Sequence, residues 1–306
     1  MKKVALLFAG QGTQTLNMHK ELLIYPKITS LFKEASKILG YDLEDICSND
    51  LEKLNNTLYT QNAILTTSLS LFEIAKEELK IDIKCALGFS LGELTALASA
   101  KVYGFLEITK ITQNRALFMS ECSNKYPGKM AAIIGLSKEE LAPFIIKYQV
   151  NIANYNLIDQ LVVSGLEQNV TSLINELKSI NVRRIIPLNV SGAFHSPLME
   201  EASLKLLKYL QNFKAKSPEF DIIMNVTNKP LEISEINNLV SKQISSSVYF
   251  YQSIAYILNN YEIDAFLEIG PGSTLSGLIR KIANKEVYTL NNLNSINLIK
   301  EKNGWT

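Results

Sequence analysis

A short apolar run, Cys85-Ala86-Leu87-Gly88, leads directly into Phe89-Ser90-Leu91-Gly92. The residues of Leu91–Ala100 that follow are mostly small or apolar, so the sequence predicts a strand, a sharp turn and then a helix. The two glycines leave room for a strained turn and for close packing of the strand against the helix. Gly-x-Ser-x-Gly also occurs by chance in ordinary tight turns. The strand and helix around it nevertheless favour Ser90 as a nucleophile at the end of a sheet.

Strands and helices alternate on both sides of this motif. Val4–Ala9 is apolar and ends at Gly10-Gln11-Gly12, and Phe266–Ile269 ends at Gly270-Pro271-Gly272, as expected of buried strands. This alternation predicts a parallel sheet covered by helices on both faces. We expect a further strand near 222–225 and helices near 18–23, 28–39, 59–79, 91–100, 105–122, 198–210, 253–260 and 275–283.

The pattern changes after Pro127-Gly128. Strands are expected at 130–135, 150–154, 161–165 and 184–190, with helices at 138–148 and 170–178. That order, β-α-β-β-α-β, is typical of a ferredoxin-like unit. The predicted fold class is therefore α/β: a large α/β-hydrolase-like domain with a parallel sheet over residues 1–127 and 194–306, and an inserted smaller ferredoxin-like subdomain over 128–193.

Composition excludes several classes of protein. The 306 residues carry 31 basic and 30 acidic side chains, so no overall positive charge favours nucleic acid. The apolar run after Met1-Lys2-Lys3 is too short for a signal peptide, and no apolar stretch reaches the ~18 residues of a membrane span. The three cysteines, Cys47, Cys85 and Cys122, are far apart and form no metal or disulfide pattern. We expect a cytoplasmic protein with reduced thiols that binds neither nucleic acid nor membrane and holds no metal.

A serine nucleophile needs a base, and the sequence offers only two histidines. His19 lies among polar neighbours in an expected helix, which predicts a solvent-facing side chain. His195 lies in Ala193-Phe194-His195-Ser196-Pro197, where the chain leaves the inserted unit, and a loop at a domain junction can aim a side chain into a cleft. His195 is therefore the expected base. A plain esterase places its histidine late, after an acid, and carries no such inserted unit between serine and histidine.

The motifs together resemble the malonyl-CoA:acyl carrier protein transacylase family, in family order and over nearly the whole chain. The matching residues are Phe8-Ala9-Gly10-Gln11-Gly12, Gly88-Phe89-Ser90-Leu91-Gly92-Glu93, Arg115, Ala193-Phe194-His195-Ser196 and Glu268-Ile269-Gly270-Pro271-Gly272.

The resemblance implies a role for each matching position. Ser90 would carry malonyl from malonyl-CoA as an ester and pass it to the phosphopantetheine thiol of acyl carrier protein, for fatty-acid synthesis. His195 would be the general acid and base. The backbone N–H groups of Gln11 and Leu91 would form the oxyanion hole, and the main-chain carbonyl of Gln243 would orient the histidine. No cofactor or metal is implied.

The sequence allows two interpretations of Arg115. An arginine on a mostly apolar helix is by default a surface charge whose stem lies along the core. The resemblance instead implies that Arg115 binds the free carboxylate of malonate, which a guanidinium grips with two charge-assisted hydrogen bonds.

Other positions bear on the acyl pocket. Phe194 and Leu91 match residues that accompany malonyl rather than methylmalonyl preference in related domains. Asn154 and Asn156 resemble a stretch lining the cleft, although turn asparagines explain them equally well. Phe89 departs from the family, which usually has histidine there; that position is not the base.

Two alternatives stay open. A serine hydrolase, either an esterase or a thioesterase, would share the serine turn but would not generally need the arginine. A catalytically silent carrier-binding scaffold would keep the fold alone. Because acyl carrier proteins are acidic, five cations are candidate docking residues or ordinary solvated charges: Lys178, Arg183, Arg184, Arg280 and Lys281.

Overall fold

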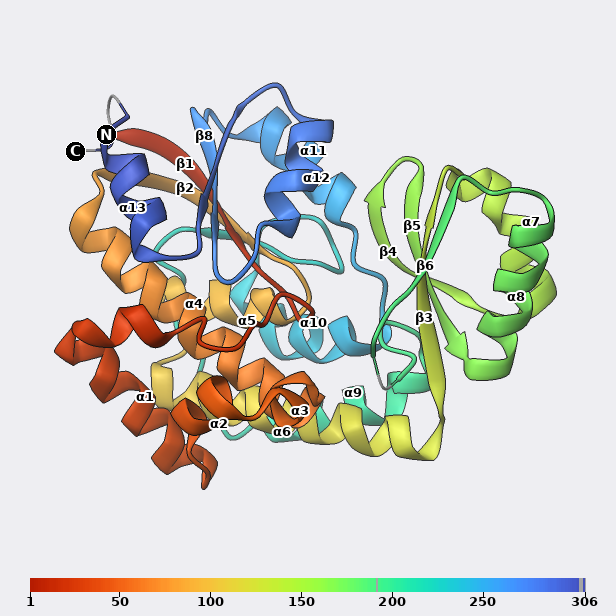
Figure 1. Ribbon diagram of the computed structural model, residues 1–306, viewed down its shortest axis with the longest axis horizontal. Helices are drawn as coiled ribbons and strands as arrows, with labels where there is room; N and C mark the ends of the chain where they lie inside the picture. Colours follow the sequence, from red (N-terminus) through yellow and green to blue (C-terminus); the bar gives the residue numbers. More distant parts are fainter. Residues whose placement is uncertain (191, 303–304, 306) are drawn as a thin grey trace.

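Two β-sheets organise the protein, and the computed structural model describes residues 1–190, 192–302 and 305 (Figure 1). The strands of the larger sheet are β1 (Lys2–Phe8), β2 (Ile81–Gly88), β7 (Asp221–Ile223), β8 (Ala265–Ile269) and β9 (Glu286–Leu290). They are parallel and follow the order β7-β2-β1-β8-β9. The smaller, antiparallel sheet consists of β3 (Gly128–Ile134), β4 (Asn151–Leu157), β5 (Gln160–Leu166) and β6 (Arg184–Pro187).

The remaining elements are helices, several of which are 3₁₀ turns. The α-helices are α1 (Pro26–Leu39), α2 (Leu43–Asn49), α3 (Leu51–Asn55), α4 (Thr57–Glu78), α5 (Leu91–Ser99), α6 (Phe105–Lys125), α7 (Lys138–Tyr148), α8 (Glu167–Ser179), α9 (Glu200–Leu210), α10 (Ile236–Lys242), α11 (Phe250–Asn260), α12 (Thr274–Ile282) and α13 (Leu293–Lys300). The 3₁₀ helices are η1 (Lys20–Ile24), η2 (Pro197–Met199), η3 (Ile233–Glu235) and η4 (Gln243–Ser245).

Strand β1 explains why the parallel sheet is buried on both faces. Successive side chains of a strand point to opposite faces. Leu6 and Phe8 join the large core built with α1, α4, α5 and α6, whereas Ala5 and Leu7 join the core under α11 and α12. A continuous apolar run with both faces covered is the pattern of a parallel strand in an α/β sheet, so the predicted fold class is confirmed.

The turn after β2 lies beside the end of β1. Phe8 pairs with Gly88 in the parallel register, and the N–H of Phe89 donates to the carbonyl of Phe8 at 3.0 Å. A Cβ on Gly92 would lie 2.1 Å from that same carbonyl oxygen, and one on Gly88 would lie 1.9 Å from the Gly92 backbone. Only glycine fits at either position, as the spacing of the motif predicts.

The smaller sheet has the strand order β4-β5-β3-β6, which is that of a split βαβ unit. Helices α7 and α8 cover the face turned away from the larger sheet (Figure 1). The unit is tied to the rest of the chain through β4: Tyr155 N–H donates to Val248 O at 2.9 Å and Val248 N–H to Ala153 O at 2.8 Å. The rings of Tyr155 and Tyr249 stack with centroids 5.0 Å apart. These contacts fix one wall of the cleft between the two units.

Several elements differ from the sequence predictions. The helix expected near 18–23 is the short η1, and the helices α2, α3, α10 and α13 and the edge strand β9 were not predicted. Helices α2 and α3 are too short for a clear hydrophobic period, and each is fixed by a capping aspartate, Asp42 or Asp50. Strand β9 mixes polar and apolar residues and is only partly buried, so it lacks the continuous apolar run that identified its neighbours.

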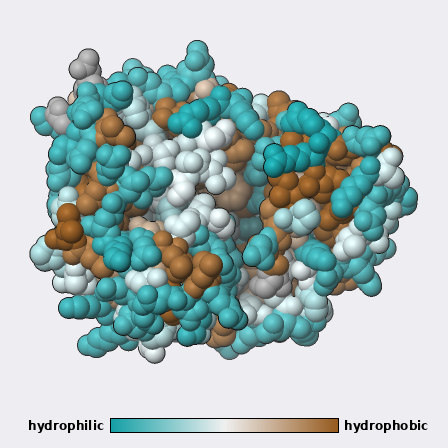
Figure 2. All heavy atoms as spheres, viewed as in Figure 1, coloured by the Kyte–Doolittle hydropathy of each residue, from teal (hydrophilic) through white to brown (hydrophobic). Residues whose placement is uncertain are grey.

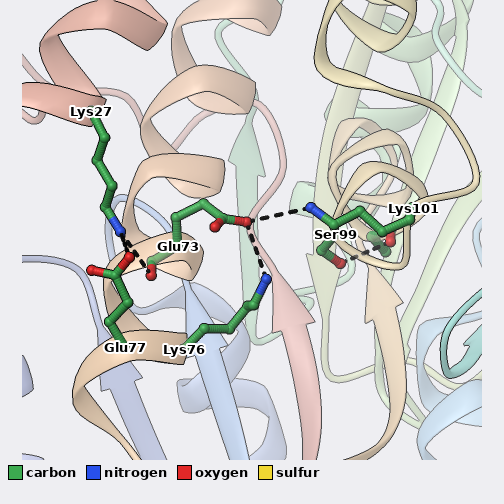
Figure 3. Close-up of polar contacts among 7 residues, drawn as sticks. Lys27, Glu73, Lys76, Glu77, Ser99 and Lys101 are labelled. Carbon is green, nitrogen blue, oxygen red and sulfur yellow. Dashed lines mark hydrogen bonds and ion pairs between the residues drawn. The ribbon is translucent and has the colours of Figure 1, made fainter.

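Charged residues join the outer helices of the large unit. Figure 3 shows Glu73 between Lys76 and Lys101, with Lys27 of α1 beside Glu77 of α4. Exposed ion pairs of this kind contribute about 0–1 kcal/mol each, so the buried apolar layers rather than these charges hold the helices in place. Among the described helices, none is long and apolar enough to cross a membrane.

Candidate active site

Ser90 stands between the end of β2 and the start of α5. Its backbone has φ 51° and ψ −105°, a conformation that non-glycine residues seldom adopt. This strained turn projects the side chain from the sheet edge at the N-terminus of α5. The sequence predicted this turn from its two glycines, and the geometry is that of a nucleophile elbow.

His195 lies beside Ser90, although it follows the smaller unit in the chain. The distance from Ser90 Oγ to His195 Nε2 is 2.8 Å. The other ring nitrogen, Nδ1, lies 2.9 Å from Gln243 O and 3.1 Å from Ser246 O. Because Nδ1 faces two carbonyl acceptors, it carries the proton, and Nε2 is free to accept from the serine hydroxyl. Two main-chain carbonyls thus occupy the place that a carboxylate has in a Ser-His-Asp triad.

The environment of His195 favours the neutral ring. Burial, and to a smaller extent the positive charge of Arg115, lower the pKa of His195 to about 4. A neutral imidazole at physiological pH is the form that can remove the serine proton.

Arg115 is fully buried on α6 and points toward the nucleophile. One guanidinium nitrogen, Nη1, donates to Gln61 Oε1 at 2.7 Å. The other, Nη2, donates to Gln243 Oε1 at 2.8 Å and to Ser90 Oγ at 3.1 Å. Burial lowers the pKa of Arg115 to about 10, so the side chain stays charged at neutral pH. The default reading as a surface charge is wrong, because Arg115 is only 1% exposed.

A cavity of about 100 Å³ opens in front of these groups, and both units contribute to its walls. In Figure 2 the surface is hollowed between the two units. The cavity is lined by Gln11, Phe89, Ser90, Leu91, Arg115, Met119, Met130, Asn154, Leu188, Val190, Phe194 and His195.

Two backbone N–H groups are available beside Ser90. The N–H groups of Gln11 and Leu91 donate to no other protein group in the described part of the chain. Leu91 is the first residue of α5, where the helix leaves its N–H groups unpaired. The side chain of Gln11 is held by Thr57 Oγ1 at 3.0 Å. Both residues line the cavity, where two free donors suit a developing oxyanion.

The remaining predicted residues divide into those that line the cavity and one that does not. Phe194 and Asn154 are nearly buried and line it, and Asn154 Nδ2 is unpartnered among the described residues. Asn156 is also buried, on the same strand β4, but is not part of the wall. Phe89 lines the cavity and packs edge-to-face on Phe250, with ring centroids 5.6 Å apart.

Sequence reasoning missed three polar residues of this site. Gln61 of α4 holds Arg115, and Asn225 binds the serine turn on both sides. Glu93 was noticed only as part of the motif, yet it is fully buried and accepts hydrogen bonds from Asn225 and Gln243. Gln61 lies among other polar residues of α4, such as Thr60 and Asn62, so the local sequence did not single it out. Nothing local marked Asn225, whose role depends on β7 lying beside β2.

The prediction that His19 faces solvent is wrong. Its ring is fully buried and packs against Phe32, with centroids 4.9 Å apart. Burial lowers the pKa of His19 to about 4. The polar neighbours in the sequence point outward instead, because η1 is a tight turn rather than an amphipathic helix. The described residues include no group of histidine, cysteine and acidic side chains that could hold a metal ion.

Comparison with known proteins identifies the family. Residues 5–301 match the acyl transferase domain family. The malonyl CoA-acyl carrier protein transacylase of Bacillus subtilis is 36% identical over 95% of this chain and 93% of its own length. That of Staphylococcus aureus is 33% identical over 100% of this chain and 99% of its own. The chain belongs to the malonyl-CoA:acyl carrier protein transacylase family.

Solved structures of this family match the enzyme along its whole length. The transacylase of Streptococcus pneumoniae superposes with a TM-score of 0.91 at 32% identity, covering 98% of this chain and 99% of that one. A malonyl-transacylase solved in complex with a type II polyketide synthase acyl-carrier protein superposes with a TM-score of 0.93 at 30% identity, covering 99% and 100%.

The lowered pKa of His195 predicts how the enzyme responds to pH. As the pH falls, the imidazole should stay neutral until about pH 4, well below the ordinary value of about 6.5, and only then lose its ability to act as a base. Proton NMR can follow this directly, because the chain has only two histidines. Neither ring resonance should shift between about pH 8 and about pH 5, and His19→Gln assigns the two signals. A His195 resonance that titrates near 6.5 would contradict the buried, neutral ring.

Proposed function

We propose that the enzyme transfers the malonyl group of malonyl-CoA to the phosphopantetheine thiol of acyl carrier protein, through a malonyl ester on Ser90. One observation carries the proposal. Ser90 Oγ lies 2.8 Å from a neutral histidine nitrogen and 3.1 Å from a buried guanidinium nitrogen. A nucleophile, its base and a cation for a free carboxylate therefore meet in one cavity.

The first half-reaction acylates the serine. His195 Nε2 takes the hydroxyl proton as Ser90 Oγ attacks the thioester carbonyl, a form of base catalysis that contributes about 10²–10⁴ in rate. The N–H groups of Gln11 and Leu91 hold the oxyanion of the tetrahedral intermediate, and loss of one such donor typically costs about 3–4 kcal/mol. The carbon–sulfur bond then breaks, and the proton on His195 passes to the departing coenzyme A thiolate.

The second half-reaction reverses these steps with the carrier. The phosphopantetheine thiol gives its proton to His195 and attacks the malonyl ester, and the carbon–oxygen bond to Ser90 breaks. The proton then returns from His195 to the serine oxygen. A nucleophile, a base and two backbone donors complete the cycle, so we propose that no cofactor or metal takes part. We also propose a cytosolic location, supported by three buried, unpaired cysteines among the described residues.

Arg115 provides the selection for malonyl. The free carboxylate would accept hydrogen bonds from the guanidinium, whose acceptors among the described residues are the neutral groups of Gln61, Gln243 and the serine oxygen. An acetyl group would forgo a hydrogen bond to a charged partner, which contributes about 1.5–3 kcal/mol. That corresponds to about 10- to 100-fold in preference. The apolar walls at Phe194, Met119 and Met130 leave little room for a larger acyl group.

Docking of the acidic acyl carrier protein is expected to depend on exposed basic residues of the enzyme. The five candidate docking cations named from the sequence are all exposed. Arg183 of the smaller unit and Lys281 of α12 line the same groove, of about 390 Å³, together with Asp159 and Tyr251. Arg183 already pairs with Asp159 at 3.3 Å, so Lys281 is the freer of the two for an acidic partner. Docking of acyl carrier protein on these residues stays a prediction.

The covalent intermediate is the direct test of the proposed function. Incubation with malonyl-CoA should add one malonyl group to the enzyme, and Ser90→Ala should abolish the adduct because the attacking oxygen is gone. Intact mass spectrometry measures both. An undiminished adduct on Ser90→Ala would contradict the proposal. Release of malonate at the same rate with and without carrier protein would instead identify a hydrolase.

Replacement of Arg115 tests the acyl selection. Arg115→Ala should lower the ratio of malonyl to acetyl transfer by about 10- to 100-fold, because the carboxylate loses its charged partner. Parallel acylation rates with the two acyl-CoA donors give the ratio. Lys208→Ala, which removes an exposed cation of α9 outside the cavity and outside the candidate docking residues, is the matched control and should leave the ratio unchanged. An unaltered ratio in Arg115→Ala would show that malonyl is selected elsewhere.

A further inference from the structure

The strained backbone of Ser90 needs support from its surroundings. A non-glycine residue at φ 51° and ψ −105° is unfavourable and persists only where neighbouring groups over-determine it. Both peptide groups of Ser90 are held by side chains from distant parts of the chain. Asn225 binds on the N-terminal side, and Gln243 binds on the C-terminal side.

Asn225 bridges the two ends of the turn. Its Oδ1 accepts from the N–H of Ser90 at 2.8 Å, and its Nδ2 donates to the carbonyl of Gly88 at 2.6 Å. The residue is fully buried just after β7, the neighbour of β2 in the sheet. The side-chain amide of Asn225 therefore holds both the N–H of Ser90 and the carbonyl of Gly88, two residues earlier.

Glu93 connects both supports. Its Oε2 accepts from the N–H of Asn225 at 2.6 Å, and its Oε1 accepts from Gln243 Nε2 at 3.0 Å. The same Gln243 nitrogen donates to the carbonyl of Ser90 at 2.8 Å. Glu93, Asn225 and the side chain of Gln243 together form what we call the elbow clamp.

Stability of the fold alone does not explain why the Glu93 carboxylate is buried here. Glu93 is fully buried, and burial raises its pKa to about 7. A buried carboxylate is unfavourable unless donors or an opposite charge compensate it. Its hydrogen bonds within the described chain go to the two clamp partners, and Arg115 lies across the Gln243 amide. An apolar side chain would fill the same space without the desolvation penalty. It would, however, accept no hydrogen bond from the Asn225 backbone N–H or from the Gln243 side-chain amide.

We propose that Glu93 and Asn225 are positioning residues of acyl transfer, which hold the Ser90 backbone so that Oγ faces His195 and the Leu91 N–H faces the cavity. Neither residue reaches the reacting atoms. Each acts through the backbone of the turn, where small displacements of a nucleophile cost large factors in rate. The inference rests on the proposed function for its acyl donor.

Kinetics of Ser90 acylation test the clamp. Asn225→Ala removes both hydrogen bonds to the turn while leaving Arg115 and the cavity wall intact. The acylation rate constant at saturating malonyl-CoA should fall about 10- to 100-fold, with KM within about twofold of the wild-type value. The malonyl-to-acetyl ratio should not change, because the group that binds the carboxylate is untouched. Glu93→Gln replaces one carboxylate oxygen with an NH2 group, which cannot accept from the N–H donors of Asn225 and Gln243. This variant should therefore also lower the rate constant.

The controls separate positioning from folding. Asn238→Ala removes an exposed asparagine of α10 and should leave all parameters unchanged. Circular dichroism and thermal melting follow the fold of each variant. Asn225→Ala and Glu93→Gln that both fail to fold would show that the clamp is structural and would overturn the proposal. A rise in KM at an unchanged rate constant, or full activity in both variants, would overturn it as well.

A second readout does not depend on the acyl donor. A fluorophosphonate probe labels an activated serine without malonyl-CoA, and its labelling rate should fall in both clamp variants by at least about 10-fold. Wild-type labelling with no malonyl adduct would defeat the proposed function but not the clamp. Unchanged labelling of the variants would defeat the clamp alone.

Discussion

The contact between Ser90 Oγ and His195 Nε2, at 2.8 Å, joins residues that are 105 positions apart. It exists because the loop that follows the smaller, antiparallel sheet brings His195 against the turn at the end of β2. The serine turn leaves β2, and the histidine follows the smaller unit, with its N–H bound to Ile244 O at 2.9 Å. His195 also has a positive φ, 57°, so both partners are held in uncommon backbone conformations. The surrounding structure must supply the free energy that keeps them there.

The opposite charges of Arg115 and Glu93 connect the Ser90–His195 contact to the selection of the acyl group. Arg115 and Glu93 are both fully buried and lie on either side of the Gln243 side-chain amide. The main-chain carbonyl of Gln243 accepts from His195, and its amide nitrogen donates to the Ser90 carbonyl. One glutamine thus contacts the base, the nucleophile turn, the cation and the acid. Reactivity of the serine and recognition of a carboxylate share a single polar network, in which a neutral histidine and a charged arginine coexist.

The local parts of this arrangement could be predicted from the sequence. Apolar runs identified the buried strands, and the glycines around Ser90 identified the turn, because only residues without a side chain fit there. The half-buried edge strand β9 and the short helices α2 and α3 were missed, since none of the three has a hydrophobic pattern long enough to detect. The limits of the inserted unit, 128–193, remain a prediction, although its strand order agrees with the expected one.

Most site residues that belong to a sequence motif were predicted. Residues that reach the site only through the pairing of distant strands were not. Asn225 reaches Ser90 only because β7 pairs with β2, and no pattern around Asn225 indicates this. His19 was misjudged for the opposite reason, because polar neighbours in the sequence do not reveal that a tight turn aims its ring inward. Glu93 shows that a charged residue on a mostly apolar helix is a signal of a buried network, whereas Gln61 lies among other polar residues of α4 and carries no such signal.

The most direct measurement is a crystal structure of the enzyme acylated on Ser90 by malonyl-CoA. The account predicts that the malonyl carboxylate lies within hydrogen-bond distance of the Arg115 guanidinium. It also predicts that the ester carbonyl oxygen points at the N–H groups of Gln11 and Leu91, with His195 Nε2 facing the ester. A carboxylate turned to solvent and away from Arg115, or an ester carbonyl remote from both N–H groups, would contradict it.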